Sequence, residues 1–229
     1  MSKPVTGLNK PLIYAGLAAA VVLGAGAWFM STPQPATPIA LQQGASTAQP
    51  ANPVAGMVLG QMDAPVTIVE YASFTCPHCK AFHDTVLPQI KRDYIDTGKA
   101  KLEFREFYLN GFDVEAGKVA QCGGPMRYFG IVDLLFKEQG SWPAGGNQAT
   151  AAANLMNIGK RAGMTDDQLK TCIGDEAHQT RMIETFQWHA ANDQIQGTPT
   201  FLVNGVKHSN MPYAEFAKVL DAAHAKATQ

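Results

Sequence analysis

The chain has 229 residues, four cysteines and a formal net charge of −1 at neutral pH. All nineteen acidic residues and sixteen of the eighteen basic residues lie from Asp63 onward, which gives that part of the chain a formal charge of −3. Nucleic-acid binding is not expected, because it rests on neutralising phosphates with basic side chains. Four cysteines are also too few for a disulfide-dense scaffold, so a hydrophobic core must hold the fold.

Residues 11–30 form an uncharged apolar run close to the length that a helix needs to cross a bilayer. Lys3 and Lys10 precede the run, and the positive-inside rule therefore keeps the N-terminus in the cytoplasm. We expect one N-terminal transmembrane helix in the inner (cell) membrane, with the rest of the chain on the periplasmic, extracytoplasmic side. The alternative is a signal peptide cleaved near Ala25-Gly26-Ala27, which would leave a soluble periplasmic protein.

Residues 31–56 are rich in proline, alanine and glutamine and show no hydrophobic period. This composition is typical of a flexible or semi-extended linker, because it offers little apolar surface to bury. We expect it to tether a folded domain to the membrane.

The folded part begins with a strand, a helix and a second strand. Residues 66–71 are rich in β-branched side chains and predict a buried strand. Beyond Pro77, apolar residues recur with helical spacing as far as Tyr94, and Pro88 is expected to kink that helix. Residues 101–108 predict the second strand. This order indicates a parallel α/β unit.

The remainder predicts a helical segment and then a return to strand structure. Residues 112–174 contain no convincing strand and favour several short helices, which we interpret as an insertion. A helix is expected at about 176–194. A strand then ends in the Asn204-Gly205 pair, which is typical of a hairpin turn, and Pro212 begins the last helix.

The sequence Cys-Pro-His-Cys at 76–79 lies between the first strand and its helix. This spacing brings two sulfurs within bonding distance and places Cys76 at the positive end of the helix dipole, which favours its thiolate. His78 is expected to add positive charge or a donor, and Pro77 stiffens the turn. A stabilised Cys76 thiolate favours the reduced pair, so the Cys76–Cys79 disulfide would oxidise other thiols.

Two other interpretations of this cysteine pair stay open. It could be half of a zinc site completed by His78 or His83, although the sequence offers no second ligand pair, or it could be an inert structural disulfide. We predict no metal and no cofactor. His83 is expected on the helix surface, and the remaining histidines are interpreted as structural: His178, His189, His208 and His224.

The stretch Val66 to His83 resembles the DsbA-like branch of the thioredoxin superfamily, in which Cys-Pro-His-Cys is the usual active-site sequence. Gly60 to Pro65 and Gly197 to Phe201 resemble it too. The resemblance implies an α/β, thioredoxin-like fold with an inserted helical domain. With the anchor, this predicts five parts: 1–30 anchor or signal, 31–56 linker, 57–111 first part of the thioredoxin-like domain, 112–174 helical insertion, and 175–229 second part.

The resemblance also implies roles for individual residues. Cys76 would be the exposed cysteine that forms mixed disulfides, and Cys79 its buried partner. Glu70 matches the position of the family's buried acid, which helps move protons at Cys79; its alternative is an ordinary strand-edge carboxylate. Pro199 matches the family's cis-proline beside the active site. In the family this proline presents backbone hydrogen-bonding groups to substrate, so Thr198 and Pro199 are expected to bind substrate. Thr198 stands where several oxidases of the family carry valine, which leaves an isomerase or reductase open.

Cys122 and Cys172 are predicted to form a second, structural disulfide in the helical insertion. Both fall in predicted helices of an exported domain, where unpaired thiols tend to be oxidised, and some branches of the family carry a disulfide there. The alternative is two unrelated cysteines that act as small hydrophobic side chains.

These observations predict an extracytoplasmic protein thiol-disulfide oxidoreductase that introduces disulfides into exported proteins with free thiols. The resemblance implies reoxidation by a DsbB-like, quinone-linked membrane oxidase, and we expect a monomer. A disulfide isomerase or reductase of the same fold is one alternative. A redox-inactive, chaperone-like binding protein is another, and it would keep most of its function after Cys76→Ser.

Overall fold

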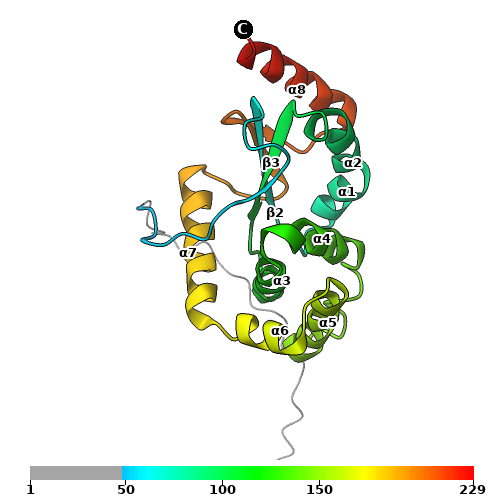
Figure 1. Cartoon of the computed structure of the whole chain (residues 1–229), viewed down its shortest axis with the longest axis vertical. Helices are drawn as coiled ribbons and strands as arrows, with labels where there is room; N and C mark the ends of the chain where they lie inside the picture. The colour runs from blue at the N-terminus through cyan, green and yellow to red at the C-terminus, as the bar shows by residue number, and fades with distance from the viewer. Residues whose placement is uncertain (1–47) are drawn as a thin grey trace, which may run out of the picture. The chain divides into compact units, whose positions relative to one another are not determined.

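The computed structural model describes residues 48–229 (Figure 1). The predicted membrane or signal segment, and most of the predicted linker, lie outside the described residues. Within residues 48–229, no helix combines the length and the apolar character that crossing a bilayer requires.

A five-stranded mixed sheet forms the centre of the domain, with strand order β1-β3-β2-β4-β5. The predicted parallel pair is confirmed, because β2 runs parallel to β3, while every other neighbouring pair is antiparallel. Strand β2 is therefore internal and can bury both of its faces. The strands are β1 (Met57–Leu59), β2 (Val66–Ala72), β3 (Ala100–Glu106), β4 (Thr200–Val203) and β5 (Val206–Ser209).

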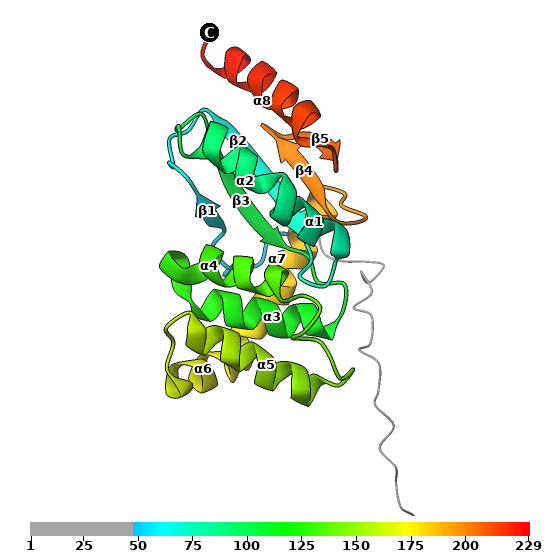
Figure 2. The same cartoon turned by 90° about the vertical axis from the view of Figure 1, so that its right-hand side faces the viewer.

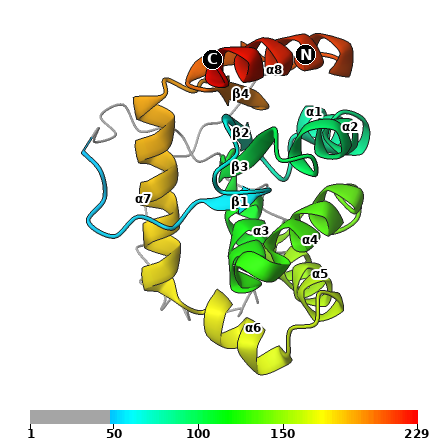
Figure 3. The same cartoon turned by 45° about the horizontal axis from the view of Figure 1, so that its top comes forward.

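Helices cover both faces of the sheet (Figures 1 and 3). Alternate residues of a strand face opposite sides, so Ile68 packs with the helices of one face and Tyr71 with α7 of the other. The elements on the Ile68 side are α1 (Pro77–Thr85), α2 (Leu87–Ile90), the π-helical turn η1 (Lys91–Ile95) and α8 (Tyr213–Ala227), and α7 is Glu176–Asn192.

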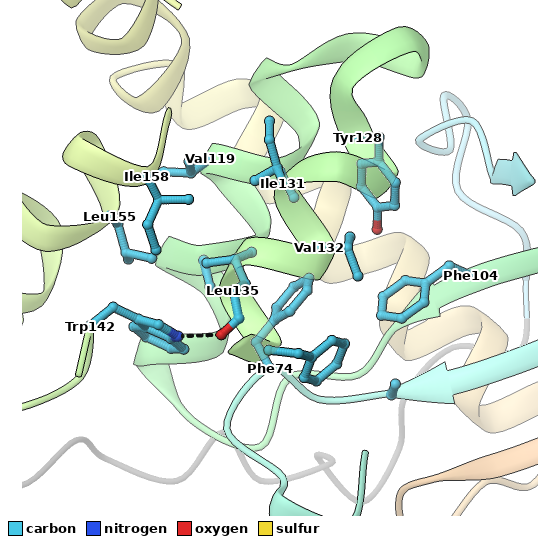
Figure 4. Close-up of a cluster of buried hydrophobic side chains, with 14 of the residues drawn as sticks. Phe74, Phe104, Val119, Tyr128, Ile131, Val132, Leu135, Trp142, Leu155 and Ile158 are labelled. Carbon is cyan, nitrogen blue, oxygen red and sulfur yellow. Dashed lines mark hydrogen bonds between the residues drawn. The ribbon is translucent and has the colours of Figure 1, made fainter. Parts of the chain in front are cut away.

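The predicted insertion is confirmed as a layer of helices at one end of the sheet (Figure 2). Its core continues into the half of the domain that contains the sheet, since Phe74 and Phe104 join the same buried cluster (Figure 4). Trp142 closes this core and donates its indole N–H to the carbonyl of Leu135 at 2.9 Å. The helices are α3 (Gly111–Cys122), α4 (Gly124–Lys137), α5 (Gln148–Arg161) and α6 (Asp166–Ile173).

The continuous kinked helix predicted after Pro77 is wrong. Helix α1 ends at Thr85, and α2 begins at Leu87 with Pro88 in its first turn. Proline has no N–H to donate and is tolerated in a first turn, so it starts a new helix instead of bending an old one. Strand β1 was not predicted, because three residues give too short a pattern to recognise.

The Asn204-Gly205 hairpin is confirmed. The two residues connect β4 to β5 with φ values of 45° and 83°, as a type I′ turn requires. At the other end of the described chain, the backbone N–H of Val54 donates to the Thr185 hydroxyl of α7 at 2.9 Å. The last residues of the predicted linker therefore contact the domain.

Candidate active site

Cys76 and Cys79 begin helix α1 at the end of β2. Cys76 is the N-cap residue, in extended backbone conformation, and Pro77 follows at the first helical position. Cys76 is 6% exposed and Cys79 is completely buried, whereas the side chains of Pro77 and His78 are exposed. Both cysteines are free thiols in this structure. An incoming thiolate can therefore reach Cys76 more readily than Cys79.

The two thiols differ sharply in acidity. The pKa of Cys76 is lowered to about 5, chiefly by a hydrogen bond from the Cys79 thiol; burial opposes this, while Thr198 and the backbone N–H groups of Cys79 and His78 assist. Burial raises the pKa of Cys79 well above its ordinary value. His78 thus acts on Cys76 through its backbone N–H, at the helix terminus where amides point toward an anion.

Thr198 and Pro199 lie beside this pair although they are more than a hundred residues away in sequence. The Thr198–Pro199 peptide bond is cis, and the Cys76 thiol donates to the Thr198 carbonyl at 3.4 Å. Strand β4 follows directly and pairs with β2. Backbone groups of the Thr198–Pro199 segment are therefore placed where a chain bound to Cys76 would meet them.

Glu70 lies beneath the cysteines in the internal strand β2 and is completely buried. The strand-edge alternative is therefore wrong. Its carboxylate is hydrogen bonded to His83 Nε2, with distances of 3.0 Å to Oε1 and 3.2 Å to Oε2, and its charge contributes to the raised pKa of Cys79. The expectation that His83 lies on the helix surface is also wrong, because its side chain is 5% exposed. Pairing with Glu70 accounts for a polar ring at this depth.

The loop before Cys76 is held by two residues of the insertion that sequence reasoning missed. Asp113 of α3 accepts hydrogen bonds from Ser73 Oγ and from the backbone N–H and hydroxyl of Thr75. Gln139, after α4, donates to the carbonyls of Phe74 at 2.8 Å and Cys76 at 2.9 Å. Asp113 therefore satisfies the hydrogen-bond donors of this loop, and Gln139 satisfies two of its backbone carbonyls. The spacing of Asn110 and Asp113 was a usable signal, because these residues form the capping box of α3.

The other cysteine pair lies within the insertion. The structure joins Cys122, at the end of α3, to Cys172 of α6 by a disulfide with a Cα–Cα distance of 5.8 Å. Neither cysteine is at a helix N-terminus. The pair thus lacks the feature that lowers the thiol pKa of Cys76.

A thioredoxin family model matches residues 52–222, which is most of the described domain. The chain belongs to the thioredoxin family. Within that family it is similar to a putative protein-disulfide oxidoreductase of Rickettsia bellii, 33% identical over 168 residues that cover 73% of this chain and 64% of the relative. Several other Rickettsia relatives match over 60–61% of their length. This thioredoxin-family chain therefore spans about three fifths of the length of these relatives.

Other relatives of this thioredoxin-family chain are matched over more of their length. Disulfide bond formation protein D of Bacillus subtilis is 38% identical over 155 residues, which cover 64% of this chain and 67% of the relative. Among solved structures, alpha-DsbA1 of Wolbachia pipientis has a TM-score of 0.69 and 29% identity, covering 76% of this chain and 92% of that protein. BdbD of Bacillus subtilis has a TM-score of 0.66 and 25% identity, and the match covers 74% of this chain and 93% of that protein. The thioredoxin-like fold with a helical insertion is confirmed.

Proposed function

We propose that this chain is a thiol-disulfide oxidoreductase that oxidises thiol pairs of exported proteins through a Cys76–Cys79 disulfide. The observation that carries the proposal is the unequal acidity of the pair. Cys76 has a pKa of about 5 at a helix N-terminus, whereas the neighbouring Cys79 has a raised pKa. A good thiolate next to a poor one is what directional exchange requires, because the better thiolate is the better leaving group.

The reaction proceeds in two exchanges. A substrate thiolate attacks Cys76 Sγ, the Cys76–Cys79 bond breaks, and Cys79 leaves and takes up a proton. A second substrate thiolate then attacks the substrate sulfur in the mixed disulfide and releases Cys76 as a thiolate. The substrate gains a disulfide and loses two electrons, and the enzyme becomes reduced.

Glu70 and the Thr198–Pro199 segment serve these steps in different ways. Glu70 lies in the buried layer with Cys79 and is the group to exchange a proton with it. The backbone around Thr198, which already accepts a hydrogen bond from Cys76, pairs with the substrate segment during the mixed-disulfide stage. No metal or other cofactor enters this cycle.

A redox titration of the purified protein against glutathione tests the oxidase function. Stabilisation of the Cys76 thiolate favours the reduced form, by about 30 mV for each unit of pKa. We therefore expect a reduction potential less negative than about −200 mV, in the range of protein disulfide isomerase and DsbA. A value near about −270 mV, that of thioredoxin, would indicate a reductase instead.

The location of the domain and its reoxidation are further parts of the proposal. The domain lies on the extracytoplasmic side, held by an uncleaved helix at residues 11–30, and a DsbB-like, quinone-linked oxidase restores its disulfide. The support for the anchor is Lys3 and Lys10 ahead of an uncharged run of bilayer length. N-terminal sequencing of the mature protein tests it: a new start near Trp28 would mean a cleaved, soluble form.

A further inference from the structure

His83 lies on the same face of α1 as Cys79, one turn further along the helix, and its ring is enclosed by aromatic side chains. Its ring centroid is 4.1 Å from that of Phe136, and the rings of Phe104 and Phe82 are each 5.8 Å away. An apolar residue would fill this space without any cost of desolvating ring nitrogens. Packing alone therefore does not explain an imidazole at this position, and the contacts of its two ring nitrogens have to be considered.

One nitrogen faces the buried carboxylate. His83 Nε2 lies 3.0 Å and 3.2 Å from the two oxygens of Glu70, so the two side chains are hydrogen bonded. Glu70 is itself completely buried. A direct exchange between its carboxylate and bulk water is blocked, and any proton that Glu70 gives to Cys79 has to be replaced along some path.

The other nitrogen, Nδ1, is not sealed within the core. No side-chain nitrogen or oxygen of residues 48–229 is both fully buried and without a hydrogen-bond partner. The hydrogen bonds of the His83 ring are made by Nε2, so Nδ1 retains access to solvent. The imidazole thus spans from solvent to the Glu70 carboxylate, and an imidazole can accept a proton at one nitrogen while it releases one from the other.

We infer that His83 is a positioning residue that fixes Glu70 and carries protons between Glu70 and solvent. This inference rests on the proposed oxidase function. When Cys79 leaves as a thiolate, Glu70 gives it a proton; solvent then protonates His83 Nδ1, and Nε2–H returns a proton to the carboxylate. During reoxidation the same path runs in reverse and takes the proton of Cys79 to solvent.

The other titratable groups near the His83–Glu70 pair do not offer a second route for protons between Glu70 and solvent. The elements packed on the His83 ring are α1 itself, β2, β3 and α4. Besides Glu70, they carry Cys79 and Tyr128, whose pKa values the Glu70 charge helps to raise, and the Tyr128 hydroxyl donates to Glu106 of β3 at 2.6 Å. Burial raises the pKa of both Tyr128 and Glu106. Glu106 also accepts hydrogen bonds from Gln121 and Tyr108, so hydrogen bonds within the core occupy both groups.

Single-turnover oxidation of a dithiol peptide by the full chain tests the inference. The comparison is between the wild type and His83→Gln, which keeps an N–H donor for Glu70 but has no second ring nitrogen. We expect His83→Gln to react about tenfold to a hundredfold more slowly at neutral pH. This loss is at or below the lower end of the rate enhancement that a positioned general acid or base contributes, about a hundredfold or more. Its glutathione equilibrium constant should stay within about twofold, because both end states of the cysteines are unchanged. His224→Gln on the terminal helix is the matched control.

Two further measurements separate relay from packing. In His83→Ala, added imidazole should restore a large part of the lost rate, and in the wild type the rate should fall in deuterated water. A wild-type rate in His83→Gln, no imidazole rescue, or equal rates in both solvents would each overturn the inference. In all three cases a wild-type chain that still oxidises the peptide leaves the proposed function standing. A wild-type chain that does not oxidise it refutes the proposed function itself.

Discussion

The carboxylate of Asp113 accepts hydrogen bonds from both the backbone N–H and the hydroxyl of Thr75, at 2.9 Å and 3.0 Å. Thr75 immediately precedes the reactive cysteine, while Asp113 lies in the first turn of α3, the first helix of the insertion. Burial raises the pKa of Asp113, and the hydrogen bonds that it accepts oppose this shift. The insertion thus holds the catalytic loop through one buried carboxylate.

Asp113→Ala should therefore destabilise the domain. The change removes the acceptor of the fully buried Ser73 hydroxyl and that of the Leu109 backbone N–H, and leaving a buried polar group unsatisfied costs about 1–3 kcal/mol. Urea unfolding of the oxidised form measures the loss. Asp133→Ala removes an exposed carboxylate paired with Lys137 and should stay within about 0.5 kcal/mol of the wild type. Equal stability of the two variants would contradict the role given to Asp113.

The two active-site cysteines should behave differently when replaced. Cys79→Ser keeps a hydroxyl donor in place of the thiol that lowers the Cys76 pKa, but it removes the sulfur that can attack a mixed disulfide at Cys76, so mixed disulfides should accumulate in the exporting cell. Cys76→Ser should abolish them, because Cys79 is completely buried and its pKa is raised. Non-reducing gels of the two variants show the difference. Equal trapping by both would mean that either cysteine can be attacked.

The stability of the reduced domain should depend on pH through Cys76. Its folded pKa of about 5 lies below the ordinary thiol value of 9.0. The stabilisation is therefore full above the unfolded pKa and is lost as the pH falls through about 5. Between pH 5 and pH 8 the free energy of unfolding should rise with pH, by at most about 1.4 kcal/mol per pH unit for one proton. The oxidised domain, which lacks this titration, is the control, and equal slopes would exclude Cys76 as the source.

The Cys122–Cys172 disulfide should stabilise the domain without joining catalysis. The bond closes a loop with a sequence separation of 50 residues, worth about 4 kcal/mol in the chain-entropy treatment. Replacing both cysteines by alanine should lower the free energy of unfolding by up to that amount and leave peptide oxidation unchanged. Mild reduction should open Cys76–Cys79 first, which alkylation and peptide mapping can show. Earlier opening of Cys122–Cys172 would reverse their assigned roles.

Local sequence patterns were sufficient for the central strand, the redox motif and the final hairpin. The β-branched run of β2, the strand-to-helix junction at Cys76 and the Asn204-Gly205 turn each depend on neighbouring residues. The resemblance supplied what these patterns do not contain. Thr198 and Pro199 meet Cys76 across a large gap in sequence, and no periodicity could indicate that contact.

The buried side chains explain where prediction failed. His83 follows Cys79 at i+4, and residues so spaced share a helix face, so a core position could have been inferred. Polarity argued against it, because its partner Glu70 belongs to a different element. Gln139 carried no signal at all, since its two acceptors are backbone carbonyls of a distant loop.

The placement of β4 after the insertion has a consequence for the order in which the enzyme matures. A chain that emerges N-terminus first presents Cys76 and Cys79 long before Thr198, which is 122 residues beyond Cys76. Strand β2 then still lacks its neighbour β4, and Glu70 has an open flank. Non-local pairings of this kind form late and slow folding. The nascent enzyme therefore passes through a stage in which its reactive cysteines, together with Cys122 and Cys172, are themselves unfolded thiols in need of an oxidant.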